Sequence, residues 1–402
     1  MVSNLAHTIR LYPNKAQETF FRKACGCARV AYNYGLGVYK KQLDAGQKPK
    51  IFDIKKQFNQ EKKTLYPWMF ETNKDANQQP FANLQSAFTR FFKKQGGFPV
   101  FKKKGIKDSF YISNDKFGVE EKKFWVPKLG WVKGAESLRF KGKITSATIR
   151  RKANYWFVVV SVETENTHAA CDNQAVVGVD LGIKTLATLS DGKMVEAVKP
   201  LRAGLERLKL LQRWASRKVK GSSNRHKANR KVAKIHYKVA CLRKDILDKL
   251  TTYLCENYQV IVIEDLNVSG MIRNHCLALS IADCGFGEFR RQLEYKSILH
   301  GNTFIVANRW FPSSKTCSGC GAVKETLLLS EREFECENCG LVIDRDLNAA
   351  INLKNYGLKQ LRAVSPKVTP VDREALVYSS SIGINETILG EAEISACTEM
   401  YM

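Results

Sequence analysis

The sequence of 402 residues contains no apolar run long enough to cross a membrane, and this absence argues against a membrane-spanning protein. A membrane-spanning helix needs about 20 mostly apolar residues, and no stretch of even about 18 occurs. The first residues, MVSNLAHTIRLYPNK, also lack the apolar core of a signal peptide. We therefore expect a cytoplasmic, nucleoid-associated protein that does not bind membranes.

Acidic residues are scarce relative to basic ones. The chain has 65 Lys and Arg against 39 Asp and Glu, which gives a net charge of +26. Such an excess favours a polyanionic partner, and nucleic acid is the first candidate. The apolar content of 44% allows substantial cores, and the length allows two to four domains.

Histidine is also rare, and most cysteines follow no pattern. The six histidines show no spacing typical of metal ligands, and eight of the 12 cysteines form no regular framework. The other four follow the pattern C-x₂-C, 15 residues, C-x₂-C, which is typical of tetrahedral Zn²⁺ sites. With four thiolates the site is closed, so we predict one structural zinc at Cys317, Cys320, Cys336 and Cys339.

Three acidic motifs indicate the chemistry. Asp180 follows the apolar run VVGV, Glu264 follows VIVI, and Asp346 stands at the start of the predicted helix in DRDLNAAINL. If these ends meet at one edge of a sheet, their oxygens suit Mg²⁺ or Mn²⁺. One or two such ions, about 3.5–4 Å apart when paired, would activate water for phosphodiester cleavage. The alternative is that each acid is a helix cap or turn residue.

Two neighbouring acids add to this prediction. Asp265 and Asp344 are candidates for groups that support the metal ligands, and Asp344 also competes with Asp346 for the third ligand position. Both aspartates precede the same segment, LNAA.

The spacing of apolar residues predicts an α+β chain with several parts. One strand is expected at residues 1–8, and β-branched and aromatic runs from 108 to 165 predict a barrel or small sheet. An α/β pattern begins at Val176. Helices are expected over residues 13–48, with Asn14 or Pro13 at the start, from 53, over 77–95, 199–257, 278–299 and 346–361.

Basic residues gather in several of these segments. Residues 201–250 hold 16 Lys or Arg against three acids, which favours contact with a polyanion. Aromatic residues between the bases of 108–165 suit stacking on nucleobases, although the same rings would also fill the core of a barrel. Predicted contacts to nucleic acid are Arg90, Lys93, Lys94, Lys102, Lys103, Lys104, Lys107, Arg150, Arg151, Lys218, Lys220 and Arg230.

The motifs together resemble the TnpB/OrfB family of bacterial insertion sequences, relatives of type V CRISPR effectors. The resemblance rests on GVDLGIKTLATLSDG, VIEDLNVSGM, RWFPSSKTCSGCG, FECENCG and DRDLNAAINL, and it covers about residues 1–360. It is also carried by LYPNKAQETFFRKACGCARVAYNYGL and by the segment from NLQSAFTRFFKK to GFPVFKKKGIKDSF.

The resemblance implies a multi-domain α+β architecture. Its parts would be a wedge barrel like an oligonucleotide-binding fold (1–8 and 96–172), a helical recognition region (9–95) and an RNase H-like RuvC domain (173–309 and 341–362). A zinc ribbon (310–340) would be inserted in the RuvC domain. An acidic tail (363–402), expected to be disordered, lies beyond the resemblance.

The resemblance further implies an RNA-guided DNA endonuclease with Asp180, Glu264 and Asp346 as its carboxylates. Its partners would be a guide RNA from the element's own end, a double-stranded DNA target beside a short flanking motif, and a companion single-strand transposase. One RuvC site would cut both strands in turn. Gln85 or Arg90 are candidates for reading the flanking motif.

The sequence is also compatible with other functions. The chain could be a transposase that joins strands as well as cutting them, which strand transfer without RNA would reveal. It could also be a non-cutting RNA-guided repressor, although a repressor is expected to have lost a carboxylate and this chain retains all three. A plain RNA-binding zinc ribbon does not explain the acidic motifs.

Overall fold

A computed structural model describes residues 2–165, 174–328 and 330–364 of the chain. The predicted acidic tail lies almost wholly outside these residues. The chain divides into two compact units, Met1–Ala169 with Lys199–Ile246 and Ala170–Val198 with Leu247–Met402. No helix in the described part is long and apolar enough to span a membrane.

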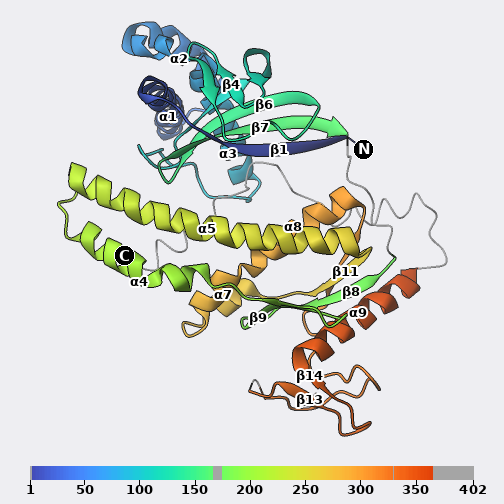
Figure 1. The fold of residues 1–402 in the computed structure, drawn as a ribbon. Coiled ribbons are helices and arrows are strands. Elements are labelled where there is room, and N and C mark those ends of the chain that lie inside the picture. Colours follow the sequence, from blue (N-terminus) through green and yellow to red (C-terminus); the bar gives the residue numbers. More distant parts are fainter. Residues whose placement is uncertain (1, 166–173, 329, 365–402) are drawn as a thin grey trace. The chain divides into compact units, whose positions relative to one another are not determined.

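The first unit contains a four-stranded antiparallel sheet in the order β1-β7-β6-β2, with three helices beside it (Figure 1). Its strands are β1 (Val2–Leu11), β2 (Ser109–Ser113), β6 (Lys143–Lys152) and β7 (Tyr155–Glu165). The helices are α1 (Lys15–Asp44), α2 (Ile51–Leu65) and α3 (Asp75–Phe92), and the 3₁₀ turns are η1 (Pro67–Glu71) and η2 (Asn114–Lys116).

A smaller antiparallel sheet follows β2 in the same unit. It consists of β3 (Gly118–Glu120), β4 (Lys123–Val126) and β5 (Gly130–Lys133). These two sheets occupy the region for which the sequence predicts a barrel or small sheet. Closure into a wedge barrel stays a prediction, and so do the domain bounds.

The start of α1 shows how local sequence sets an element. The Asn14 side chain accepts a hydrogen bond from the Gln17 backbone (2.9 Å), and the Gln17 side chain accepts one from the Asn14 backbone (3.1 Å). This capping box satisfies two donors that the first turn leaves unpaired, and it confirms Asn14 as the helix start. Along the helix, buried Phe21 packs on Phe110 and Trp156 of the sheet, with ring centroids 5.8 and 5.1 Å apart.

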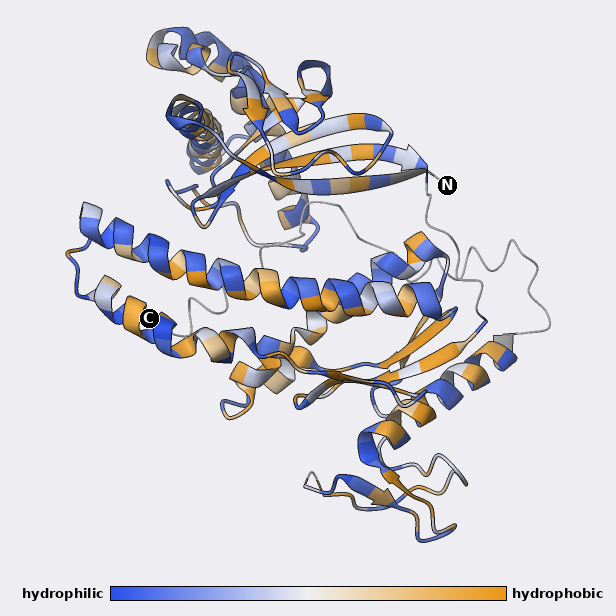
Figure 2. Ribbon diagram, viewed as in Figure 1, coloured by the Kyte–Doolittle hydropathy of each residue, from blue (hydrophilic) through white to orange (hydrophobic). Residues whose placement is uncertain are grey.

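Two long helices carry much of the basic charge. They are α4 (Pro200–Ser216) and α5 (Ser223–Asn257), and α5 continues from the first unit into the second. Figure 2 shows α5 mostly in the colours of hydrophilic residues, whereas the strands of the second unit are largely hydrophobic. This contrast agrees with the sequence, in which 16 of the residues from 201 to 250 are basic.

The second unit is built on a mixed five-stranded sheet in the order β10-β9-β8-β11-β12. Strands β8, β11 and β12 are parallel neighbours, and β9 and β10 continue from β8 in antiparallel fashion. The strands are β8 (Val176–Asp180), β9 (Thr185–Leu189), β10 (Met194–Glu196), β11 (Val260–Glu264) and β12 (Thr303–Ala307).

Helix α9 (Arg345–Val364) lies unusually close to this sheet because two glycines leave room for it (Figure 1). A Cβ atom on Gly178 of β8 would lie 2.0 Å from the Ala350 carbonyl oxygen. A Cβ atom on Gly357 of the helix would lie 2.5 Å from a methyl of Val262 on β11. A side chain at position 178 would therefore displace the backbone of α9, and one at position 357 would displace the Val262 side chain.

The predicted helix over residues 278–299 is in fact two helices. Helix α7 (Ala278–Cys284) ends and α8 (Phe286–His300) begins at Gly285, whose φ of 70° places it in the left-handed region. A short helix, α6 (Val268–Ile272), precedes them, and a hairpin of β13 (Glu333–Glu335) and β14 (Val342–Asp344) leads into α9.

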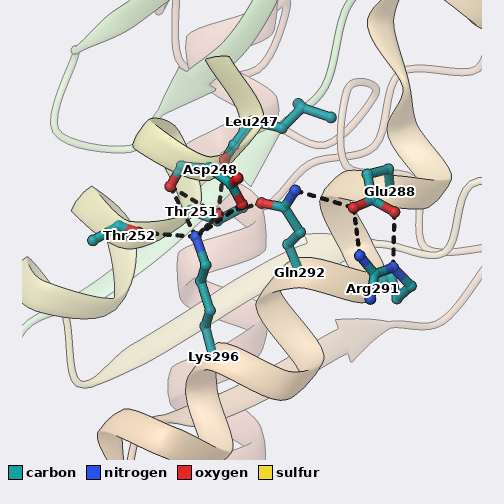
Figure 3. A network of polar contacts seen from close by, with 8 residues as sticks. All are labelled: Leu247, Asp248, Thr251, Thr252, Glu288, Arg291, Gln292 and Lys296. Atoms are coloured by element: carbon teal, nitrogen blue, oxygen red, sulfur yellow. Dashed lines mark hydrogen bonds and ion pairs between the residues drawn. The ribbon is translucent and has the colours of Figure 1, made fainter. Parts of the chain in front are cut away.

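A buried polar network joins the last turns of α5 to α8 (Figure 3). The Lys296 ammonium, 9% exposed, donates at 2.8 Å to the Asp248 carbonyl and to the hydroxyls of Thr251 and Thr252. The Thr251 hydroxyl in turn donates to Gln292 (2.9 Å). Because a buried ammonium is costly unless its donors are paired, this network fixes the position of α8 on α5.

Candidate carboxylate site and cysteine cluster

The structure brings the three predicted carboxylates of the second unit together. Asp180 ends β8 and Glu264 ends the parallel neighbour β11, where Val179 and Ile263 are register partners. Asp346 lies in the first turn of α9. Burial raises the pKa of Asp180 well above its usual range, and the negative charges of Glu264 and Asp346 raise it further. The Asp180 carboxyl is therefore close enough to both other acids at the sheet edge for their charges to shift its pKa.

Asp344 and Asp346 have different environments. The Asp344 carboxylate accepts hydrogen bonds from the backbone N–H groups of Asp346 (3.0 Å) and Leu347 (2.9 Å), which is the geometry of a helix N-cap. The charge of Asp346 is one of the main causes of the raised pKa of Asp180, and that of Asp344 is not. The contacts thus make Asp344 the cap of α9 and leave Asp346 beside Asp180.

Glu264 has one fixed partner, which the sequence did not indicate. The Ser313 hydroxyl donates a hydrogen bond to Glu264 Oε1. Burial raises the pKa of Glu264, and this hydrogen bond partly opposes the rise because it stabilises the charged form. The Ser313 carbonyl accepts from the Asn352 side chain of α9 (2.8 Å), so the serine itself is held in place.

Asp265, predicted as a supporting residue, is paired with two arginines. Arg290 of α8 and Arg309 each donate to one of its carboxylate oxygens at 2.6 Å. Although burial by itself raises the pKa of Asp265, these hydrogen bonds bring it below its ordinary value. A cleft of about 200 Å³ opens beside this group, lined by Glu264, Asp265, Leu266, Asn267, Ala307, Asn308, Arg309 and Phe311.

The four predicted cysteines converge in the ribbon that precedes α9. Their sulfur atoms all lie within 4.8 Å of one another, with 3.6 Å separating Cys317 from Cys339 and Cys320 from Cys336. Four sulfurs placed tetrahedrally at about 2.3 Å from a Zn²⁺ ion would be about 3.8 Å apart. The donor set and its spacing therefore fit a closed zinc site. Among the described residues the carboxylates do not gather this tightly, as expected of like charges.

Two asparagines of α9 hold the ribbon through its backbone. The Asn348 side chain donates to the Thr316 carbonyl (2.7 Å) and accepts from the Ser318 N–H (2.9 Å). Asn352 donates to the Thr316 carbonyl as well (2.6 Å) and to that of Ser313. Both side chains are buried. The segment that starts the cysteine cluster is thereby tied to the helix that carries Asp346.

The twelve predicted nucleic-acid contacts all belong to the first unit, whereas the carboxylates and the cysteines belong to the second. Nine of the twelve are exposed, and Arg90, Arg150 and Arg151 are half-buried. Arg150 donates to the Thr8 hydroxyl (3.3 Å) and Arg151 to the Asn154 side chain, and all twelve contacts stay predictions. Gln85, proposed to read a flanking motif, is exposed on α3.

Sequence profiles of known families match most of the chain. A profile described as "Probable transposase" (OrfB_IS605) matches residues 158–275, which include Asp180 and Glu264. A "Cas12f1-like, TNB domain" profile matches residues 286–353, which include the cysteines and Asp346. A "Helix-turn-helix domain" profile of OrfB_IS605 matches residues 1–48.

Individual relatives extend the match over nearly the whole chain. A protein of Streptomyces pristinaespiralis named "Putative RNA-guided DNA endonuclease" is 36% identical over 88% of this chain and 89% of its own length. A protein of Escherichia coli (strain K12) named "Putative RNA-guided DNA endonuclease InsQ" is 32% identical over 88% of this chain and 92% of its own length.

The fold also has a counterpart among solved structures. The protein in a Cas12f1–sgRNA–target DNA complex superposes with a TM-score of 0.54 at 15% identity, covering 84% of this chain and 83% of that one. At that identity the likeness concerns the α+β fold alone. With a relative more than 30% identical over almost its full length, the chain belongs to the TnpB/OrfB family of insertion-sequence proteins.

Proposed function

We propose that this protein is an RNA-guided, divalent-metal-dependent DNA endonuclease of an insertion sequence. The observation that carries the proposal is the convergence of Asp180, Glu264 and Asp346 from three separate elements at one edge of the sheet. Relatives that match the chain over nearly its full length carry the name of such an enzyme.

The carboxylate site fits Mg²⁺ or Mn²⁺. Three acidic side chains supply hard oxygen donors, and the charge that they concentrate is unfavourable until a cation neutralises it. Bound there, one or two divalent ions would supply charge stabilisation and an activated water for phosphodiester hydrolysis. Asp180, Glu264 and Asp346 would hold the ions, and Ser313 fixes the orientation of Glu264.

The cysteine cluster fits one Zn²⁺ ion with a structural role. All four positions around the ion would be filled by thiolates, which leaves none for substrate. Because Asn348 and Asn352 tie this cluster to α9, its folding supports the helix that presents Asp346.

The basic first unit is suited to binding the nucleic acids. The segment that follows α3 exposes Lys93, Lys94, Lys103 and Lys104, and α4 and α5 add further positive charge. Contacts of this kind hold phosphates without reading sequence, so sequence choice would come mostly from pairing between guide RNA and DNA target. We propose a guide from the element's own end and a short flanking motif read by the protein.

The test begins with RNA that co-purifies with protein expressed from its native locus. One abundant RNA ending in the flank of the element defines the guide and the matching DNA target. The purified complex should then cut that target in Mg²⁺, and Asp180→Ala should abolish cutting while leaving RNA and target binding within about twofold. Absence of a defined RNA, or cutting by the Asp180→Ala variant at the wild-type rate, would refute the proposal.

A transposase that also joins strands is the second candidate, favoured by the family description "Probable transposase". The same preparation separates the two. Transfer of labelled element ends to new DNA by protein freed of RNA would establish joining. Guided cutting without transfer would exclude it, and binding without cutting would leave the repressor.

A further inference from the structure

Trp310 is far more exposed than any other tryptophan of the chain. Its side chain is 85% exposed, whereas the other five tryptophans range from 3% to 49%. A single exposed apolar residue can be incidental. The fixed positions of its neighbours distinguish Trp310 from such a case.

The indole stands at the tip of a tight, well-fixed turn. The Asn308 carbonyl accepts from the Phe311 N–H (2.9 Å), which places Arg309 and Trp310 at the two central positions. The Asn308 side chain accepts from the Trp310 N–H (2.9 Å) and reinforces the turn. Arg309 is held by Asp265, and Phe311 packs on Tyr356 with ring centroids 4.9 Å apart. The backbone on both sides of Trp310 is therefore anchored.

This turn borders the candidate catalytic site. Strand β12 ends at Ala307, the register partner of Glu264, and the turn begins one residue later. Asn308, Arg309 and Phe311 line the same cleft as Glu264. Trp310 thus carries an exposed ring on an anchored turn whose other three residues line the cleft.

We propose that Trp310 stacks on an unpaired base of the DNA strand whose phosphodiester bond lies at the carboxylates. The inference rests on the proposed nuclease function. A paired base hides its faces in the duplex, whereas a single strand drawn into the site presents a face that an indole covers. Trp310 takes no part in the bond cleavage, but it fixes the strand's register relative to Asp180 and Glu264.

The experiment uses the purified ribonucleoprotein with Asp180→Ala, which prevents cutting. An oligo(dT) with one central 2-aminopurine reports stacking through loss of fluorescence on titration. Adding Trp310→Ala should weaken binding about 5- to 150-fold, the range for one lost base-stacking contact, and should abolish the quenching. Trp310→Phe should keep most of both. The control is Trp68→Ala, which removes a 39% exposed indole from η1 and should change neither.

Two further readouts separate this inference from the nuclease proposal. Trp310→Ala should melt at the wild-type temperature because the ring is exposed, and in the active protein it should slow guided cutting without changing RNA affinity. Equal quenching by Trp310→Ala and its parent would overturn the stacking role even where guided cutting is established. Quenching by a protein that cuts no guided target would refute the nuclease proposal and, with it, the position of the strand at the carboxylates, and would leave only the contact between Trp310 and a single strand.

Discussion

The most discriminating prediction compares the same substitution at two aspartates that stand two residues apart. Asp344→Asn and Asp346→Asn each remove one negative charge near the start of α9. Their surroundings differ, because Asp344 caps the helix and Asp346 lies close enough to Asp180 for its charge to raise the pKa of that carboxyl. Because both variants lose the same charge, any difference between them reports the role of the residue. Each variant is therefore the matched control for the other.

The magnitudes follow from these contacts. Asparagine still accepts the two cap hydrogen bonds, so Asp344→Asn loses only the charge–dipole contribution of about 0.3–1 kcal/mol. At about 2–4 °C per kcal/mol for a domain of this size, we expect Tm to fall by about 1–4 °C and cutting to stay within about threefold. Asp346→Asn removes a proposed metal ligand worth several kcal/mol in the transition state, which is about a thousandfold in rate.

The assay is guided cutting of a labelled duplex under single turnover in Mg²⁺, with a thermal melt of each protein. Asp344→Ala is a useful third variant, because it removes the cap acceptor and should cost a further 0.5–2 kcal/mol of stability. Equal losses of rate from both asparagine variants would refute the assignment. Loss of cutting in Asp344→Asn alone would make Asp344 the ligand and Asp346 the incidental neighbour.

Three further predictions follow from the charges and the cysteine cluster. The pKa values of Asp180 and Glu264 are raised, so these carboxyls stabilise the metal-free fold below their unfolded pKa near 4 and lose that contribution as the pH rises through their folded pKa. Carboxyls with a lowered pKa, such as Asp265, titrate alike in wild type and in Asp180→Asn, so the difference between the two proteins isolates Asp180. In chelator, the Tm of wild type relative to that of Asp180→Asn should therefore fall as pH rises from about 4, and a difference that does not change with pH would contradict the reasoning. Replacing Cys317 and Cys320 with Ser should remove the bound zinc, as measured by atomic absorption. The variant should also expose residues 310–345 to protease while its RNA binding persists. A ribbon as resistant to protease as that of wild type would show that the metal is dispensable for folding. Lys103→Ala with Lys104→Ala should reduce the slope of log affinity for RNA against log salt by about 1.4–1.8, because two phosphate contacts are lost, and an unchanged slope would remove these lysines from the interface.

Much of the carboxylate site could be predicted because it depends on local patterns. Apolar runs that end in an acid predicted the ends of β8 and β11, and the start of α9 followed from DRDLNAA. Parallel strands bring their carboxyl ends to one edge, so the meeting of Asp180 with Glu264 required no further information. The cysteine spacing predicted its cluster for a similar reason, since each pair forms a short turn.

The partners of these groups could not be predicted, because they are distant in sequence and follow no period. Ser313 reaches Glu264 across 49 residues, and Arg309 reaches Asp265 across 44. A carboxylate pattern does not reveal which hydroxyl or guanidinium will approach it. The break between α7 and α8 was missed for another reason, since a glycine inside a periodic stretch is also compatible with one continuous helix.

The bracing of the ribbon by Asn348 and Asn352 has a consequence for the substitutions that the ribbon tolerates. Both amides bind main-chain atoms of the loop, namely the Ser313 and Thr316 carbonyls and the Ser318 N–H. Contacts to main-chain atoms do not depend on which side chains the loop carries. Changes of the Thr316 and Ser318 side chains should therefore leave the ribbon docked on α9, whereas loss of either asparagine amide should loosen it.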